Sequence, residues 1–194
     1  MLPNRQCHSW KTPVLGRGHA SPTIVGNRIY LATADEQKQE QWLLAFDRAT
    51  GKELWRQGIH KGGLDSRCHQ KNTQASSTVA CDGERVYAAF CNKDQVFVSA
   101  ISVEGKPVWQ QSVGRFNSRF GFSASPTLYR DTVIIAADHY KGGGYVAALD
   151  VRTGRQKWKQ NRPDNASYGS SEKICNIGSE VQSADQTWIV GHAF

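Results

Sequence analysis

The chain has 194 residues, of which 39% are hydrophobic, and a formal net charge of +7. This composition is typical of a globular protein. There is no apolar run of about 18 residues that could cross a membrane, and the first residues lack the apolar core of a signal peptide. The 24 basic and 17 acidic residues are spread along the sequence, so we expect no nucleic-acid partner and no membrane span.

A lead-in at residues 1–18 is followed by a unit that contains four short candidate strands. The strands are rich in β-branched and aromatic residues, and turns or polar loops separate them. Glycine occurs in the turns at Gly26 and Gly51, where a left-handed backbone conformation is easily adopted. The pattern predicts an antiparallel meander with strands at residues 23–25, 28–33, 42–46 and 53–57.

The same unit then recurs twice. AFDRATGKELW ends at Trp55, AISVEGKPVW ends at Trp109, and ALDVRTGRQKW ends at Trp158. A second matching piece precedes each of them: SPTIVGNRIY, TVACDGERVY and SPTLYRDTVI. A period of about fifty residues indicates a repeat architecture. We place the repeats in a region at residues 19–170, with units at about 19–60, 74–112 and 123–160.

Four-stranded sheets that repeat along a chain, with both faces apolar, predict an all-β fold of the β-propeller type. Each closing tryptophan offers a flat apolar face and one N–H donor, so we expect it to be largely buried against the next blade. Trp10 and Trp188 lie outside the repeats, and we expect them to contribute less. The repeated positions with a structural role are expected to be Asp47, Gly51, Trp55, Gly105, Trp109, Asp150, Gly154 and Trp158.

The signature A-x-D-x-x-T-G-x-x-x-W resembles the repeat of pyrroloquinoline-quinone-type (PQQ-type) propellers, and the phrases GRGHASP, ACDGERVY and ADHYKGGG are similar to a bacterial family of PQQ-like repeat proteins. The resemblance implies a propeller of the cell envelope or periplasm. It leaves two functions open, because the repeat is shared by a non-catalytic outer-membrane assembly lipoprotein and by quinoprotein dehydrogenases. The second unit departs from the signature, with Ser102 in place of aspartate and a turn that is one residue shorter.

After Trp158 a fourth unit begins but does not reach a closing signature. Residues 171–194 are expected to form a partial fourth blade or an irregular tail. Because propellers close with about four to eight blades, we expect the chain to be a fragment of a larger propeller. The apolar faces and sheet edges at its open ends would then favour self-association.

The chemistry-bearing residues favour a binding or scaffold module over an enzyme. A quinoprotein site needs a stacking platform, a calcium ion held by oxygen ligands and an aspartate base, and the family's enzymes typically also have two adjacent cysteines. No two of the five cysteines are adjacent, and no histidine pair has metal-ligand spacing. We therefore expect no cofactor and no metal; the alternative is a fragment of a dehydrogenase that binds PQQ and calcium.

In a four-stranded meander, the tight turns lie on one edge and the longer loops and interblade connections lie on the other. Loops on a rigid scaffold are where binding usually occurs. We expect a protein partner or small ligand to bind at the loop edge near the mouth of the central channel. The candidate residues precede the first strands of successive blades and are aromatic, amide-bearing or imidazole-bearing: His19, His69, Asn72, Phe120 and Tyr168.

Overall fold

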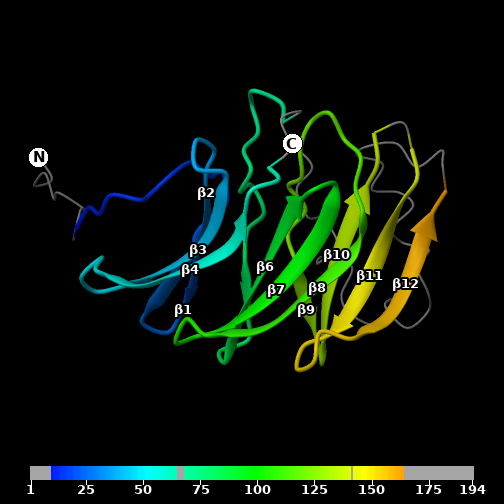
Figure 1. Cartoon of the computed structure of the whole chain (residues 1–194). Helices are drawn as coiled ribbons and strands as arrows, with labels where there is room; N and C mark the ends of the chain where they lie inside the picture. The colour runs from blue at the N-terminus through cyan, green and yellow to red at the C-terminus, as the bar shows by residue number, and fades with distance from the viewer. Residues whose placement is uncertain (1–9, 65–67, 141, 164–194) are drawn as a thin grey trace, which may run out of the picture.

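Three four-stranded antiparallel sheets make up the computed structural model, which describes residues 10–64, 68–140 and 142–163 (Figure 1). Blade 1 contains β1 (Thr23–Val25), β2 (Arg28–Asp35), β3 (Glu40–Asp47) and β4 (Glu53–Lys61). Blade 2 contains β5 (Ala80–Cys81), β6 (Arg85–Asn92), β7 (Gln95–Ser102) and β8 (Pro107–Arg115). Blade 3 contains β9 (Thr127–Tyr129), β10 (Thr132–Asp138), β11 (Gly144–Asp150) and β12 (Gln156–Arg162).

Each sheet is a simple meander in which neighbours in sequence pair with each other. The described residues form no helix. The four strands expected in the first unit are all present, although β2 and β4 run further than the sequence pattern indicated. Their extra residues continue the pairing with β3 toward the loops, where Asp35 pairs with Glu40 and Lys61 pairs with Glu40 from the other side.

Side-chain alternation explains why the middle strands of each blade are apolar at nearly every position. In blade 2, Val86, Ala88 and Phe90 belong to the core shared with blade 1. The intervening Tyr87 and Ala89 belong to the core shared with blade 3. Blade 2 is therefore buried on both faces, and its sequence could not be stable as an isolated sheet.

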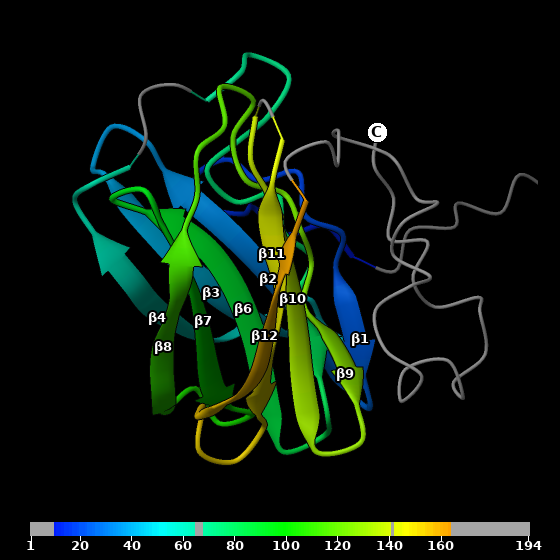
Figure 2. The same ribbon diagram turned by 90° about the vertical axis from the view of Figure 1, so that its right-hand side faces the viewer.

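The blades stand side by side with their first strands together (Figure 2). The Thr23 hydroxyl donates to the Val79 carbonyl oxygen at 2.7 Å, which joins β1 to the start of blade 2. The Ser77 hydroxyl donates to the Ala124 carbonyl oxygen at 2.7 Å, which joins the start of blade 2 to that of blade 3. This radial arrangement is that of a β-propeller, as the sequence predicted.

The closing tryptophan of one blade docks on the last turn of the next. The Trp55 indole N–H donates to the Val103 carbonyl oxygen at 2.9 Å, and the Trp109 indole N–H donates to the Val151 carbonyl oxygen at 3.0 Å. Within its own blade, each tryptophan lies opposite a small residue, Ala45 for Trp55. Trp55 and Trp109 are partly buried and pack against the two interblade cores. The burial of these residues and of Trp158 is incomplete, because the last strand is the outermost strand of its blade.

Glycine in the receiving turn makes room for the indole. A Cβ atom at Gly105 would lie 2.7 Å from Trp55 Cγ, and one at Gly154 would lie 2.6 Å from Trp109 Cδ2. Both glycines have positive φ, 88° and 72°, a conformation that other residues rarely adopt. The turn of blade 3 is further held by Asp150, whose carboxylate accepts the backbone N–H of Thr153 at 2.8 Å.

The turn of blade 2 is shorter, as the sequence indicated. The Gly105 N–H donates to the carbonyl oxygen of Ser102, three residues earlier, at 2.8 Å. In blade 1 the Gly51 N–H donates to the carbonyl oxygen of Asp47, four residues earlier, at 2.8 Å. Both turns nevertheless present the same glycine to the preceding tryptophan, so the missing residue changes the turn without changing the contact.

Trp10, which was expected to contribute less than the repeat tryptophans, makes the same kind of contact as they do. Its indole N–H donates to the Arg48 carbonyl oxygen at 2.9 Å. Its ring covers Gly51, where a Cβ atom would lie 2.3 Å from Trp10 Cε3. The repeat pattern did not single out this tryptophan, because the residues printed before it do not carry the A-x-D-x-x-T-G signature. Trp188 and the partial fourth blade lie outside the described residues.

A buried polar cluster also joins blades 1 and 2. The side-chain amide of Gln41 donates to the carbonyl oxygens of Gln74 at 2.8 Å and Cys91 at 3.2 Å, and its oxygen lies 2.9 Å from His60 Nδ1. The His60 ring also packs 5.0 Å, centroid to centroid, from the ring of Phe97. Burial lowers the pKa of His60 to about 4, so the imidazole is neutral near neutral pH.

Replacing Trp109 with alanine should lower the free energy of unfolding by about 3 kcal/mol, because it removes a large side chain from an interblade contact and empties the space over Gly154. Urea denaturation followed by circular dichroism measures the change. Val108→Ala is the matched control, because the neighbouring Val108 side chain is 46% exposed. Equal losses for the two variants would show that the indole contact does not hold the blades together.

Acidification should destabilise the protein between about pH 6.5 and pH 4 through His60. In this window the unfolded chain binds a proton at His60, whose ordinary pKa is 6.5, whereas the folded chain does not, so stability falls as the pH falls. The difference in pKa corresponds to about 3 kcal/mol, and we expect about 2 kcal/mol because the ring keeps some contact with water. Urea titrations at several pH values measure this slope.

The slope should flatten in His60→Gln, whose side chain can still bond Gln41 but does not titrate. His69→Gln, which changes an exposed histidine, is the matched control. An unchanged pH profile in His60→Gln would assign the acid sensitivity to other groups.

Candidate functional site

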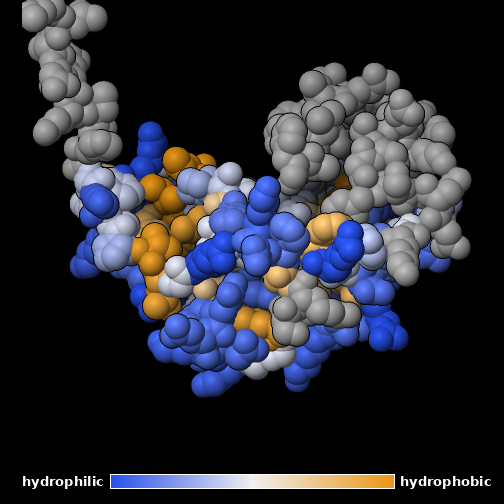
Figure 3. Space-filling view, turned by 90° about the horizontal axis from the view of Figure 1, so that it is seen from above, coloured by the Kyte–Doolittle hydropathy of each residue, from blue (hydrophilic) through white to orange (hydrophobic). Residues whose placement is uncertain are grey.

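The two edges of the blades differ in the way that the sequence predicted. The β3–β4, β7–β8 and β11–β12 turns lie along one edge, which runs from the left to the bottom of Figure 1, and the connections between blades lie along the other. We call this second edge the loop rim; its described residues include 68–75, 116–126 and 138–140. Figure 3 looks down on it and shows mainly hydrophilic surface across the middle of the molecule, with smaller apolar areas between.

Aromatic and basic side chains from two interblade connections and the β10–β11 loop meet on the loop rim. The Arg119 guanidinium lies 4.4 Å from the ring centre of Tyr140 and 4.9 Å from that of Phe120. The Phe120 and Tyr140 rings contact edge to face at 5.5 Å, and the His69 ring lies 5.9 Å from Phe120 on the other side. We call His69, Asn72, Arg119, Phe120 and Tyr140 the rim cluster.

Hydrogen bonds fix the backbone under the rim cluster. The Asn72 side-chain amide donates to the Phe120 carbonyl oxygen at 2.7 Å, which ties the connection before blade 2 to the connection before blade 3. The Tyr140 N–H donates to the Asn117 carbonyl oxygen at 2.7 Å. Gly121 is required between them, because its φ is 84° and a Cβ atom would lie 2.8 Å from Asn72 Nδ2.

A second aromatic layer supports the cluster from below. Phe116 and Phe122 contact edge to face at 5.3 Å, and both are buried. His139 packs between Phe116 and Tyr145 at 6.4 and 6.2 Å. Its Nδ1 accepts the Asn117 N–H at 3.2 Å, which leaves the ring proton on Nε2. Burial raises the pKa of the Tyr145 hydroxyl, so this hydroxyl is uncharged near neutral pH.

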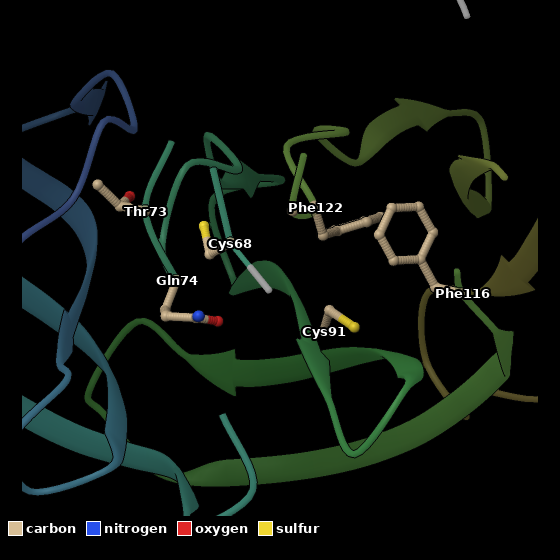
Figure 4. Close-up of a pocket in the computed structure, with 7 residues that line it drawn as sticks. Cys68, Thr73, Gln74, Cys91, Phe116 and Phe122 are labelled. Carbon is tan, nitrogen blue, oxygen red and sulfur yellow. The ribbon is translucent and has the colours of Figure 1, made fainter. Parts of the chain in front are cut away.

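A small cavity lies beside the Phe116–Phe122 pair (Figure 4). Its volume is about 10 Å³, room for roughly one water molecule. It is lined by Cys68, Thr73, Gln74, Cys91, Phe116, Gly121 and Phe122. Neither its size nor its lining matches an organic ligand. The rim cluster, in which His69 and Arg119 are exposed, is therefore the candidate binding surface.

The structure brings together three of the five residues proposed from the sequence. His69, Asn72 and Phe120 belong to the rim cluster. His19 is exposed on the same edge, where its N–H donates to the Ala75 carbonyl oxygen at 3.1 Å, but it does not touch the other three. Tyr168 lies outside the described residues.

Sequence reasoning missed Arg119 and Tyr140, although both lie in or beside connections that it assigned to this edge. An arginine next to an aromatic residue was the available signal. It was weak because the sequence does not show that the loop after β10 bends back over the connection before blade 3.

Among the described residues, no group of three or more His, Cys, Asp or Glu side chains is arranged to hold a metal ion. In the same ranges, no helix is long and apolar enough to span a membrane.

Comparison with curated proteins gives relatives of two kinds. The chain is 25% identical over 155 residues to quinohemoprotein alcohol dehydrogenase ADH IIB of Pseudomonas putida, an alignment that covers 77% of this chain and 22% of that protein. It is 29% identical over 143 residues to outer membrane protein assembly factor BamB of Burkholderia pseudomallei (strain K96243), covering 74% of this chain and 30% of that protein. The chain thus spans less than a third of either relative.

Solved structures agree on the fold. Quinohemoprotein alcohol dehydrogenase from Comamonas testosteroni superposes with a TM-score of 0.58 at 23% identity, over 75% of this chain and 21% of that one. The family model described as outer membrane protein assembly factor BamB matches residues 39–191, which is more than half of the chain. The three tryptophan-closed blades and this match together place the chain in the BamB-like family of PQQ-type β-propeller repeat proteins.

Proposed function

We propose that this chain is a non-catalytic binding or scaffold module of the cell envelope that engages a protein partner through the rim cluster. The observation that carries the proposal is the arrangement of Arg119, which is exposed and stacked on two aromatic rings. Arginine and tyrosine are enriched among the residues that contribute most to protein–protein binding. The BamB relative, named as an assembly factor, supports a role in protein assembly.

The charge of Arg119 indicates what the partner supplies. Arg119 forms no ion pair with any described residue, whereas Arg162 at the end of β12 pairs with Asp138. The exposed guanidinium lies over both rings, and a guanidinium can bind a carboxylate with two parallel hydrogen bonds. An acidic side chain or a terminal carboxylate of the partner would complete this pair.

The alternative, a fragment that binds PQQ with calcium, is not favoured by the described residues. A tricyclic quinone does not fit a cavity of about 10 Å³, and the rim cluster contributes no carboxylate to a calcium ion. The dehydrogenase relative is more than four times as long as the part it shares with this chain. A quinone site of that protein would then draw on parts that the alignment with this chain does not cover.

The binding proposal predicts site-specific crosslinking. A photo-activated phenylalanine analogue at Phe120 should give one discrete crosslinked product in a bacterial envelope extract, and the same analogue at Val108 on the outer strand should give none. Arg119→Gln should reduce the yield several-fold. The matched control is Arg130→Gln, because Arg130 also stacks on a tyrosine, Tyr129 at 5.1 Å, but lies in a tight turn on the opposite edge.

Crosslinking followed by mass spectrometry measures the yields. Equal products at positions 120 and 108, or equal losses in the two arginine variants, would contradict a partner site on the rim cluster.

The purified chain should not retain PQQ. In equilibrium dialysis with excess calcium, we expect equal quinone concentrations on both sides of the membrane, because the cavity beside Phe116 and Phe122 is too small for a tricyclic quinone. Near-stoichiometric retention with a shifted quinone absorbance would instead support the dehydrogenase alternative.

A further inference from the structure

Residues 10–17 cover the free face of blade 1 as the last strand of a preceding blade would. Trp10 occupies the slot over Gly51 that Trp55 occupies over Gly105 in the next blade. The lead-in is also held by the Thr33 hydroxyl, which donates to the Leu15 carbonyl oxygen at 2.5 Å, and by a bridge between Arg17 and Ala34 with backbone bonds of 2.8 and 3.1 Å.

The covered face still has the character of an interblade surface. Trp42 lies on the side of β3 that faces away from blade 2, and its indole nitrogen is buried with no hydrogen-bond partner among the described residues. The matching residue of blade 2, Phe97, packs on His60 of blade 1. Apolar surface gathers at the blade 1 end in Figure 3, where Val14 of the lead-in is 42% exposed.

Blade 3 presents the complementary face at the other end of the stack. Trp158 makes no hydrogen bond to a described residue, whereas the indoles of Trp10, Trp55 and Trp109 each donate to the following turn. Ile134, which pairs with Ala148, is partly exposed. The corresponding tyrosines of blades 1 and 2, Tyr30 and Tyr87, are 1% and 0% exposed.

The turn of blade 1 has the same hydrogen bonds as the turn of blade 3, which Trp109 of blade 2 contacts. In both, the aspartate carboxylate accepts the N–H and the hydroxyl of a threonine at 2.8 Å: Asp47 with Thr50, and Asp150 with Thr153. The blade 1 turn is therefore the kind of receptor on which Trp158 would dock. A second copy of this chain supplies that pair of surfaces.

We propose that residues 10–17 cap blade 1 and that the capped surface is a head-to-tail docking site for blade 3 of a second copy of the chain. Trp10 and the incoming Trp158 compete for the slot over Gly51. A head-to-tail contact forms a closed ring if its rotation allows. The described residues of two copies contain twice three sheets, six in all, which lies within the roughly four to eight blades of closed propellers.

The test is the mass of the whole chain in solution, measured by sedimentation velocity over a range of concentrations. Trp10→Ala should raise the mass about twofold at concentrations where the wild-type chain remains monomeric. The remaining anchors of the lead-in, at Leu15 and Arg17, are unchanged in this variant. Trp10→Ala/Trp158→Ala should return the mass to that of the monomer, because this variant also lacks the Trp158 indole that would dock over Gly51 of the second copy.

A control separates docking from aggregation of a misfolded chain. Trp10→Ala/Val108→Ala removes an exposed apolar side chain away from the blade faces and should associate as Trp10→Ala does. Association of Trp10→Ala/Trp158→Ala as strong as that of Trp10→Ala would overturn the proposal, as would a monomeric Trp10→Ala chain at every concentration. The rim cluster is not involved, so the result is independent of partner binding.

Discussion

The stack depends on one interaction, the docking of an indole on a glycine in the next blade. The glycine is needed twice, because the turn requires positive φ and the ring occupies the space where a side chain would begin. The indole N–H then satisfies a carbonyl group at the end of the turn. Because blade 2 receives this contact from blade 1 and gives it to blade 3, the spacing and orientation of the blades are set locally, by neighbours, as in other repeat proteins.

The docking contacts at the turn edge explain why the candidate site lies on the loop rim. The turn edge is occupied by the docking contacts, which require short, similar turns. The opposite edge has no such requirement, so its connections differ in length and in residue type. Asn72 and Gly121 bring two of those connections into direct contact. The rim cluster thus combines a rigid base with partly exposed aromatic rings and an exposed arginine, the combination expected of a recognition surface.

The apolar sheet faces at the ends of the stack must be covered, as those in its middle are. Blade 2 has both faces covered by neighbours, whereas blade 1 is covered on its outer side by the lead-in, with Trp10 in the docking slot. A sheet face that is apolar because a neighbour is expected must be covered or it becomes a site of association. The same face of blade 1 can therefore be capped by the lead-in or, as proposed above, bound by a second copy, and in both cases an indole docks over Gly51.

The sequence alone determined the all-β propeller fold, the three repeats that form the described blades, the four strands of the first blade and the edge on which the long connections lie. Strand periodicity and the recurring tryptophan and glycine are local, so they can be read without a structure. Three features were visible only in the tertiary structure: the docking of Trp10, the contacts among His69, Asn72 and Phe120, and the position of Arg119 over Tyr140. Each joins segments far apart in sequence through contacts that depend on how blades pack and loops bend, and no local pattern specifies these.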